Sequence, residues 1–539
     1  MINLTVLKDK KILVIVESYK KMQTIASIFH NLNLNNVTVT TTNGLIATIS
    51  NSKKSFKYTG IYPKENFRAD WELISNKHGI ILSVMNQVQQ ADKIYIFSDP
   101  DANGIQYAWS LVTFLNLGSY NYSWVPLDTL TEESIKQALL NENLLDMPLV
   151  DAAQTHLIIN KLFSYAVNPF IKTYLGINTL SLVHAFLLSL IIKREQEITD
   201  FVSKDPYYKL IATFNTNNKS YEAKYIEQLA NENTAIRLKN NCINILKLTK
   251  ITKKTQPFIL NTLTILQKAE EELQLSASTT LIYLQQLFEG ILIDGQLYSL
   301  ISFYKTTEPI YCTNLQFTPD FLKSKLKSKV LLKLYNLIWN YSQVQQTINF
   351  IYELETSNLK FVLVTTDNLE LTTVSDVNFE IQKYLNKAPD RYTEVQLLTE
   401  LAKLNLDYLN INLDTFLTKK QAYCTVVNDQ IIPTRDGIYL GKYLERNFAA
   451  ITSKEYQQKL FNQINSIRQN KCSKEQVLSD FYTILELSLS LVREVRPKLD
   501  IIIKCPICDN PMILKKNRWG KYFYGCSQWP DCKGIREKL

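Results

Sequence analysis

The sequence contains no apolar run that could cross a membrane. The longest such run lies near residues 182–192 and is interrupted by His184 and Ser189, so it falls short of the roughly 20 residues that a membrane-spanning helix needs. Residues 1–11 have no continuous apolar stretch before a small-residue cleavage site, which argues against a secretory signal. Repeats of fixed period and low-complexity linkers are also missing. We therefore expect a soluble, intracellular protein.

The cysteines do not follow the pattern of a secreted protein that is stabilised by disulfide bonds. Of the eight cysteines, four are scattered and four cluster near the C-terminus, which indicates reduced thiols and a metal site in a reducing compartment. Glycine is scarce, with 13 residues in 539, whereas Ile, Leu, Asn, Lys and Tyr are abundant. This bias fits an AT-rich genome, of a bacterium with a small genome or of an organelle. We therefore expect the protein in the cytoplasm, on the nucleoid, or in an organelle matrix such as that of a plastid.

The sequence contains enough apolar residues to form several hydrophobic cores. Hydrophobic residues make up 46% of the 539 residues, which excludes global disorder and indicates about three to five domains. The formal net charge is +9. This charge permits a polyanionic partner such as nucleic acid, but a solvated basic surface would give the same value.

The apolar pattern changes along the chain. Residues 11–18 and 93–98 each have the pattern of a short buried strand followed by a helix, which predicts an α/β domain over residues 8–145. Further along, we expect long helices at 150–200, short strands at 207–251, helices at 261–290, a strand at 297–304, a mixed region up to 380 and helices at 391–500.

The four C-terminal cysteines predict a structural zinc site. Cys505 and Cys508 are two residues apart, Cys526 follows after 17 residues, and Cys532 follows after five more. Four thiolates in two pairs suit tetrahedral Zn²⁺ and fill its coordination shell. Between the pairs lie cations beside aromatic rings, as binding to single-stranded nucleic acid requires. The residues expected to bind DNA are Lys515, Lys516, Arg518, Trp519, Lys521 and Tyr522. The alternative is that the aromatic rings only cover the small core of the ribbon.

Three carboxylates follow the two predicted strands. Glu17 ends the first strand, and Asp99 and Asp101 end the second. If both strands belong to one parallel sheet, these carboxylates meet at its carboxyl edge, where ligands bind. Three oxygen donors in one place suit Mg²⁺. The alternative role for the two aspartates is to cap the helix that follows.

Several motifs in a fixed order resemble type IA DNA topoisomerases. Residues 14–25 resemble the opening motif of the family, with Glu17 and Lys21 at catalytic positions, and residues 98–104 resemble the Toprim motif, with Asp99 and Asp101 as its aspartates. Similar segments follow in family order at 127–139, 150–171, 180–198, 257–263, 284–293 and 391–406. The order of these motifs is more specific than any one of them, and it makes a Toprim nuclease or primase a poor alternative.

The resemblance implies a multidomain α/β and α+β fold, in which a Toprim domain and a clamp, or toroid, enclose DNA. The implied domains are Toprim at 8–145, a helical base at 150–205 and 380–500, an arch at 206–256 and 310–380, the domain that carries the nucleophile-position strand at 257–309, and a zinc ribbon at 501–539. Members cut one DNA strand through a tyrosine, hold the 5′ phosphate covalently, pass another strand and reseal the break. The resemblance implies Mg²⁺ at the Toprim site, with Glu17, Asp99 and Asp101 as its ligands, and DNA as the partner of a monomer.

The sequence departs from the family at the nucleophile. In the segment 300–306, the position of the family's tyrosine is Phe303 and that of its arginine is Lys305. Phenylalanine has no oxygen with which to attack phosphorus. Tyr304 is adjacent, but neighbouring side chains of a strand face opposite ways, so we expect it to point away from Lys305 unless a bulge re-aims it.

Other family residues are replaced as well. An arginine expected near the DNA is His184, and no histidine lies beyond it, so the family's later histidine motif is missing. Two hypotheses follow. The chain is a divergent topoisomerase that attacks with Tyr304, or it is a catalytically silent clamp that binds single-stranded DNA as an accessory factor. The missing nucleophile favours the silent clamp, whereas the intact carboxylates favour a metal site that is still in use.

Overall fold

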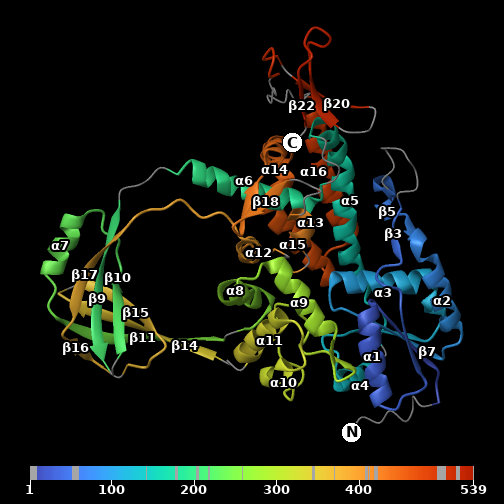
Figure 1. Cartoon of the computed structure of the whole chain (residues 1–539), viewed down its shortest axis with the longest axis horizontal. Coiled ribbons are helices and arrows are strands. Elements are labelled where there is room, and N and C mark those ends of the chain that lie inside the picture. Colours follow the sequence, from blue (N-terminus) through green and yellow to red (C-terminus); the bar gives the residue numbers. More distant parts are fainter. Residues whose placement is uncertain are drawn as a thin grey trace. The chain divides into compact units, whose positions relative to one another are not determined.

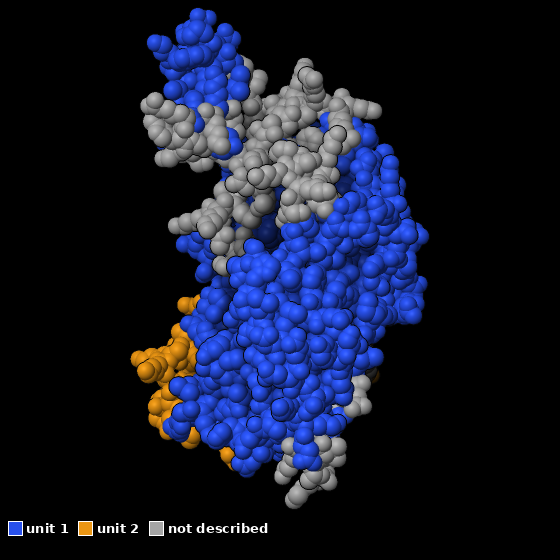
Figure 2. All heavy atoms as spheres, turned by 90° about the vertical axis from the view of Figure 1, so that its right-hand side faces the viewer, with its two compact units in different colours: residues 1–192, 275–305, 392–539 blue, residues 193–274, 306–391 orange. Residues whose placement is uncertain are grey.

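The structure is a computed structural model that describes residues 9–50, 60–140, 143–175, 180–201, 206–216, 219–257, 259–342, 346–357, 359–369, 371–406, 409, 411, 413–417, 423–494, 505–510, 512–517 and 522–537. The chain divides into two compact units, the first made of residues 1–192, 275–305 and 392–539 and the second of residues 193–274 and 306–391. Figure 1 labels the elements of both units, and Figure 2 colours the units blue and orange.

The first unit begins with a four-stranded parallel sheet in the order β2-β1-β7-β8. Its central strands β1 (Ile12–Val16) and β7 (Lys93–Ser98) are buried along their whole length, as expected for strands with helices on both faces. The other strands and helices here are β2 (Val37–Thr41), β8 (Tyr122–Pro126), α1 (Tyr19–Asn31), α2 (His78–Gln89), α3 (Ala102–Phe114) and α4 (Glu132–Ala138). Short elements are β3 (Ala47–Ile49), β4 (Ile61–Tyr62), β5 (Arg68–Ala69), β6 (Trp71–Leu73) and the 3₁₀ helices Pro63–Glu65, Ser75–Lys77 and Leu117–Ser119. The strands predicted at 11–18 and 93–98 are confirmed.

Helices make up most of the remaining first unit. They are α5 (Met147–Leu175), α9 (Ala277–Glu289), α12 (Glu394–Lys403), α13 (Leu413–Leu417), α14 (Arg435–Thr452), α15 (Lys454–Arg468) and α16 (Lys474–Glu494), and α6 (Leu182–Thr199) crosses from the first unit into the second. Helix α5 packs against α3, α15 and α16, and so joins the sheet to the helical part. Two hairpins complete this part, β12 (Ile291–Ile293) with β13 (Gln296–Tyr298) and β18 (Cys424–Val427) with β19 (Gln430–Pro433).

The second unit is built on a seven-stranded antiparallel sheet in the order β16-β11-β14-β15-β10-β9-β17. Large apolar side chains such as Phe214, Tyr352 and Phe361 form its core. The strands are β9 (Tyr207–Thr216), β10 (Lys219–Tyr225), β11 (Ile245–Pro257), β14 (Gln346–Thr356), β15 (Leu359–Thr365), β16 (Thr373–Ser375) and β17 (Asn378–Tyr384). The helices are α7 (Glu232–Asn240), α8 (Thr262–Leu273), α10 (Pro319–Lys323) and α11 (Lys329–Ser342).

The C-terminal ribbon is a three-stranded antiparallel sheet of β20 (Met512–Lys516), β21 (Tyr522–Cys526) and β22 (Ile535–Glu537). In the part of the chain that the structure describes, every helix is too short or too polar to cross a membrane. The predicted combination of an α/β domain, mixed α and β domains and a terminal ribbon is confirmed.

Candidate active site and zinc ribbon

Two carboxylates lie at the end of the parallel sheet, as the strand pattern predicts. Strands β1 and β7 are parallel neighbours, with Val16 opposite Phe97. Glu17 follows β1 and Asp99 follows β7, so both lie at the carboxyl edge of the sheet. The backbone N–H of Asp99 donates to Oε1 of Glu17 at 3.3 Å. The prediction that these two strand ends meet is confirmed.

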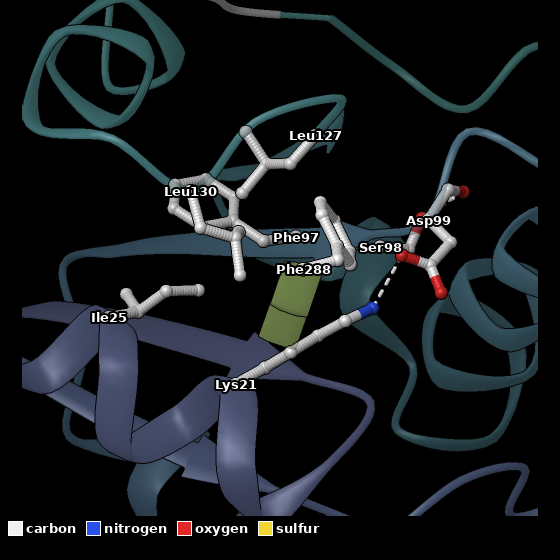
Figure 3. Close-up of a pocket in the computed structure, with 8 residues that line it drawn as sticks. All are labelled: Lys21, Ile25, Phe97, Ser98, Asp99, Leu127, Leu130 and Phe288. Carbon is white, nitrogen blue, oxygen red and sulfur yellow. Dashed lines mark hydrogen bonds and ion pairs between the residues drawn. The ribbon is translucent and has the colours of Figure 1, made fainter. Parts of the chain in front are cut away.

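Lys21 joins the two carboxylates. Ser18 caps helix α1 by accepting the backbone N–H of Lys21. One turn into this helix, the Lys21 ammonium donates to Oε2 of Glu17 at 2.8 Å and to Oδ1 of Asp99 at 2.5 Å. Figure 3 shows the lysine extending from α1 to Asp99. The side chain of Lys21 is only 5% exposed, so its charge depends on these two anions in place of water.

Burial sets the protonation of these groups. It raises the pKa of Glu17 to about 7, because the charge of Lys21 offsets only part of the lost hydration and the neighbouring Asp99 adds to the rise. Burial by itself lowers the pKa of Lys21, but the charges of Asp99 and Glu17 outweigh it and the net direction is upward. Lys21 therefore stays charged, whereas Glu17 can gain or lose a proton near neutral pH.

Asp101 forms the N-cap of helix α3. Its Oδ1 accepts the backbone N–H of Gly104 at 2.8 Å, and burial raises its pKa although this hydrogen bond opposes the rise. A Cβ on residue 104 would lie 2.0 Å from the carbonyl oxygen of Asp99, so only glycine allows this close turn. The capping role that the sequence left open is therefore present for Asp101.

The three carboxylates do not form a closed metal cage. Among the described residues, only the four ribbon cysteines bring three or more ligand atoms within 4.8 Å of one another. At the sheet edge, the Lys21 ammonium lies between Glu17 and Asp99. Oxygen donors in this position suit Mg²⁺, which takes one or two carboxylates and keeps several waters. The donor chemistry thus fits a divalent cation that shares the carboxylates with Lys21.

The segment around Tyr304 is not the strand that the sequence predicts. Strand β13 ends at Tyr298, and residues 302–305 are irregular. The chain leaves the extended form because the backbone N–H of Phe303 donates to the carbonyl oxygen of Asp128, in the loop after β8, at 2.6 Å. The Lys305 ammonium lies 5.8 Å from the centre of the Tyr304 ring. The strand predicted at 297–304 is therefore confirmed only at its start, residues 297–298, and the rest of it is wrong. The expectation that Tyr304 points away from Lys305 is also wrong.

The Tyr304 side chain lies among the charges of the site. The residue is 6% exposed, and burial is the main reason that the pKa of its hydroxyl is raised. Nearby negative charges raise it further, and they belong to Asp99, Glu289, Asp101 and Glu17. The Tyr304 ring lies 6.2 Å from that of Phe288, and the Lys21 ammonium lies 5.5 Å from the centre of the same Phe288 ring, so the tyrosine ring packs beside the ion pair. The Tyr304 hydroxyl stays protonated at neutral pH and needs a proton acceptor before it can attack.

Phe303 has an apolar environment. Its ring lies 5.4 Å from that of Phe288 in an edge-to-face arrangement, and the residue is 4% exposed. The ammonium of Lys21 lies 5.5 Å from the centre of the Phe288 ring. Phe303 therefore anchors the irregular segment, while the charge of the neighbouring Lys305 acts on Asp101 and opposes the rise in its pKa.

Glu289 is a site residue that the sequence interpretation missed. It is the last residue of α9, and its Oε1 accepts a hydrogen bond from Ser18 at 3.2 Å. Its carbonyl oxygen accepts one from Thr24 at 2.7 Å, and its charge acts on both Lys20 and Tyr304. An acidic side chain at a helix C-terminus opposes the helix dipole. This unfavourable position of an acidic residue, directly before Gly290, is the sequence feature that could have indicated a functional role for Glu289.

A small, mostly apolar pocket adjoins the ion pair of Lys21 and Asp99 (Figure 3). Its lining residues are Lys21, Ile25, Phe97, Ser98, Asp99, Leu127, Leu130 and Phe288. The apolar side chains keep water from one side of the ion pair, which strengthens the interaction between its charges.

His184 cannot take the place of the guanidinium that the family has at this position. Its ring packs 5.3 Å from that of Phe416 on α13. Burial lowers the pKa of His184 to about 4, so the ring is neutral at pH 7 and offers no positive charge to a phosphate.

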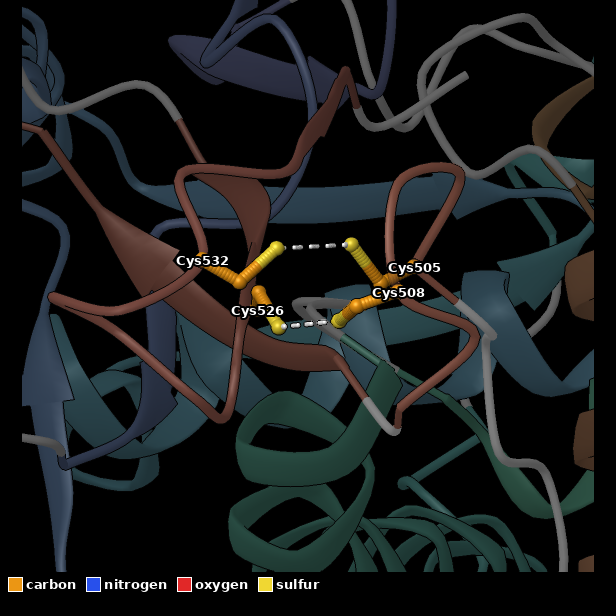
Figure 4. Close-up of side chains that lie close together, drawn as sticks. All are labelled: Cys505, Cys508, Cys526 and Cys532. Carbon is orange, nitrogen blue, oxygen red and sulfur yellow. Dashed lines mark hydrogen bonds between the residues drawn. The ribbon is translucent and has the colours of Figure 1, made fainter.

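The ribbon brings its four thiols together (Figure 4). The Sγ atoms of Cys505 and Cys532 are 3.6 Å apart, and those of Cys508 and Cys526 are 3.4 Å apart. All four lie within 4.8 Å of one another. A zinc ion with Zn–S bonds of about 2.3 Å needs sulfurs about 3.8 Å apart. The side-chain amide of Asn510 donates to Sγ of Cys508 at 3.5 Å, and a hydrogen bond of this kind favours the thiolate that zinc binds. The geometry supports Zn²⁺ at these cysteines.

Two of the predicted DNA-binding residues of the ribbon can be placed. Lys515 lies on β20 and Tyr522 on β21. The stem of Lys515 passes over Gly525, where a Cβ would lie 3.1 Å from it, beside the ring of Phe523. Arg518, Trp519, Lys521 and the side chain of Lys516 lie outside the described residues.

The zinc site makes a direct prediction. We expect Cys526→Ser to lose the bound zinc and unfold the ribbon, because metal binding supplies the folding free energy of such small modules. Zinc released on denaturation, measured with a chromogenic chelator, should fall from about one per chain to near zero. Cys472→Ser, which removes a cysteine outside the ribbon, is the control and should keep its zinc. Equal zinc contents in the two variants would contradict the assignment.

Comparisons with known families follow the same order along the chain. The Toprim domain matches residues 12–126, the DNA topoisomerase family matches residues 145–325, and the topoisomerase DNA binding C4 zinc finger matches residues 502–538. The solved structure of full-length topoisomerase I from Thermotoga maritima resembles this chain with a TM-score of 0.74 and 22% identity, over 98% of this chain and 97% of that one. At this identity the likeness shows the fold. The three family matches in this order identify the chain as a member of the bacterial-type IA DNA topoisomerases.

Proposed function

We propose that the protein relaxes supercoiled DNA by transient cleavage of one strand, with Tyr304 as the nucleophile. The observation that carries this proposal is the position of the Tyr304 ring, which packs 6.2 Å from the ring of Phe288. The ammonium of Lys21, which pairs with Glu17 and Asp99, lies 5.5 Å from the centre of the same Phe288 ring. Lys305 lies over the Tyr304 ring. A nucleophile, a proton acceptor and cations for the phosphate are the groups that this reaction needs.

In the proposed cleavage reaction, one bond to phosphorus forms, another breaks, and two protons are transferred. The Tyr304 oxygen attacks the phosphorus, the bond from phosphorus to the 3′ oxygen breaks, and the 5′ phosphate stays on the tyrosine. Glu17 accepts the phenolic proton, and the 3′ oxygen of the DNA leaves as a hydroxyl by taking up one proton from water. Lys21 and Lys305 neutralise the phosphate. Religation reverses these transfers and leaves the protein unchanged.

Asp99, Asp101 and Glu17 would hold Mg²⁺ in this proposal. Their oxygens are the donors that this ion prefers, and when bound it would neutralise phosphate charge beside the reacting group. Lys21 holds Glu17 and Asp99 together before any metal binds. The lysine therefore keeps the two acids in place when DNA arrives.

The DNA substrate would contact the protein as a single strand at the ribbon. The proposed contacts are Lys515, Lys516, Arg518, Trp519, Lys521 and Tyr522. Aromatic rings stack on unpaired bases of any sequence while cations meet the phosphates. We propose that the protein acts as a monomer, with the Toprim, base, arch and nucleophile-bearing regions divided as the sequence predicts.

A catalytically silent clamp is the second candidate, and a specific observation favours it. Phe303 stands at the family's tyrosine position, and His184, which replaces a guanidinium, is neutral. In that case the chain would bind single-stranded DNA without cutting it. The two candidates make opposite predictions about a covalent adduct.

The deciding experiment is relaxation of a negatively supercoiled plasmid by the purified full-length protein with Mg²⁺. A parallel reaction is stopped with denaturant to trap protein bound to DNA. Relaxation together with an adduct on the 5′ end of the cut strand is expected. Salt-sensitive binding of single-stranded DNA without any adduct would support the silent clamp instead.

A further inference from the structure

Helix α3 (Ala102–Phe114) contacts the end of strand β1 through one tyrosine. Tyr107 lies in the second turn of this helix and is 1% exposed. Its hydroxyl donates to the carbonyl oxygen of Val16 at 2.6 Å. Val16 is the last residue of β1 and directly precedes Glu17. The helix that Asp101 caps therefore also holds the backbone beside Glu17.

A second hydroxyl connects Tyr107 to the other side of Glu17. Thr42 is fully buried, and it shares its hydroxyl proton between the Tyr107 oxygen at 3.2 Å and the carbonyl oxygen of Gly44 at 2.8 Å. The backbone N–H of Gly44 donates to the carbonyl oxygen of Glu17 at 2.7 Å. Both carbonyl groups that flank the Cα of Glu17 are therefore held, directly or through Thr42 and Gly44, by the Tyr107 hydroxyl.

The loop that carries Thr42 and Gly44 is itself held in place. The Lys77 ammonium donates to the carbonyl oxygen of Thr42 at 2.7 Å and to that of Asn43. Asn43 and Gly44 have φ angles of 51° and 93°, in the left-handed region that asparagine and glycine tolerate best. The loop therefore presents the Gly44 N–H to Glu17 from a tight turn with bound carbonyl groups.

The carboxylate of Glu17 is held by other groups than its backbone. Its two oxygens accept the Lys21 ammonium at 2.8 Å and the backbone N–H of Asp99 at 3.3 Å. The backbone contacts set the position of the Cα, and the carboxylate contacts set the orientation of the side chain. Because a displacement of about 1 Å in an active site can cost about 100-fold in rate, the backbone contacts matter as much as the carboxylate contacts.

The hydroxyl of Tyr107 does not serve to fill the core. The ring belongs to the apolar cluster of the parallel sheet, where phenylalanine would fill nearly the same space. Burying a hydroxyl costs free energy unless hydrogen bonds replace its lost hydration. Burial raises the pKa of Tyr107, which the hydrogen bond from Thr42 opposes and the charge of Glu17 supports. The hydroxyl therefore stays protonated at neutral pH and remains a donor to Val16.

We propose that Tyr107 is a positioning residue for Glu17. Its hydroxyl fixes the backbone on both sides of Glu17, so that the carboxylate lies where it binds a divalent cation and accepts the proton of Tyr304. This inference rests on the proposed function, which gives Glu17 both roles. Tyr107 touches neither DNA nor metal in the proposed reaction and acts only through Glu17.

Binding of Mn²⁺ in the absence of DNA tests the inference without any cleavage. Mn²⁺ takes the same oxygen ligands as Mg²⁺, and electron paramagnetic resonance measures the free ion. We expect Tyr107→Phe to weaken Mn²⁺ binding by the full-length protein about tenfold, as is typical when a group that supports a metal ligand is removed. The zinc content of the ribbon should stay unchanged.

Ser110→Ala is the matched control. Ser110 is fully buried on the same helix, and its hydroxyl donates to the carbonyl oxygen of Tyr107 at 2.7 Å. Each variant loses one buried hydroxyl, so the denaturant midpoints of the two should fall by similar amounts. Because the Ser110 hydroxyl bonds within the helix, the control should keep the Mn²⁺ affinity of the unmodified protein.

Relaxation kinetics provide a second readout. At a fixed Mg²⁺ concentration, Tyr107→Phe should lower the kcat of plasmid relaxation about tenfold. The KM for DNA should stay unchanged, because Tyr107 acts on Glu17 and not on DNA. Thr42→Val should act in the same direction. Its effect should not add to that of Tyr107→Phe, since both variants break the same chain of hydrogen bonds.

An unchanged Mn²⁺ affinity in Tyr107→Phe, an equal loss in Ser110→Ala, or an unmodified protein that binds no Mn²⁺ would each overturn the inference. If the protein relaxes plasmid, an unchanged kcat in Tyr107→Phe would overturn it as well. A protein whose Mn²⁺ affinity falls as expected in Tyr107→Phe, but which neither cuts nor relaxes plasmid, would contradict the proposed strand cleavage alone.

Discussion

Tyr304→Phe is expected to abolish the covalent adduct between protein and DNA and to lower relaxation by on the order of a thousandfold or more. The reason is that the variant loses only the oxygen that attacks phosphorus. The ring stays among Phe288, Phe303 and Lys305, which it already contacts, so the segment keeps its packing. The measurement is a plasmid relaxation time course, with adducts counted after denaturation and the modified peptide identified by mass spectrometry.

The matched control for this change is Tyr298→Phe in the adjacent hairpin. The Tyr298 hydroxyl donates to the side chain of Gln296 on β13, and Tyr298 has no role in the proposed reaction. This variant should relax plasmid at the rate of the unmodified protein. An adduct that persists in Tyr304→Phe, or an unmodified protein that forms no adduct, would exclude Tyr304 as the nucleophile.

The sequence correctly predicted those parts of the site whose position depends on a pattern of neighbouring residues. The apolar runs of β1 and β7 each end in a carboxylate, and parallel strands bring their carboxyl ends to one edge. The spacing of the four cysteines likewise predicted the ribbon, because a tetrahedral metal needs closely paired ligands. In both cases the pattern lies next to the functional residues in the sequence: each apolar strand directly precedes its carboxylate, and each cysteine pair is closely spaced.

The parts that could not be predicted depend on contacts between distant segments. The strand predicted at 297–304 ends early because the backbone N–H of Phe303 donates a hydrogen bond to the carbonyl oxygen of Asp128. The sequence around either residue contains no pattern that predicts this hydrogen bond. Glu289 reaches the site from the end of α9, which Gly290 holds against Thr24. The alternation of side chains along a strand therefore wrongly predicted that Tyr304, the proposed nucleophile, points away from Lys305.

Lys21→Met is expected to have the second large effect, on stability as well as on catalysis. Removing the ammonium leaves Glu17 and Asp99 beside each other without a counter-charge. Losing one partner of a buried ion pair costs about 3–5 kcal/mol. Strand cleavage should fall as well, because Lys21 would no longer neutralise the phosphate. Denaturant unfolding followed by tryptophan fluorescence measures the change in stability.

The sign of the pH dependence follows from Glu17. Burial raises the pKa of Glu17 to about 7, and removing the opposing charge of Lys21 would raise it further, so this carboxyl is neutral at pH 5.5 and the repulsion with Asp99 is relieved. The stability difference between the native protein and Lys21→Met should therefore be largest at pH 8 and shrink by about 1–2 kcal/mol at pH 5.5. Lys20→Met removes the same charge one residue away, from a half-buried side chain, and should cost less than about 1 kcal/mol at either pH. Equal losses in the two variants, or a difference that grows toward low pH, would show that Lys21 is not the counter-charge of the two acids.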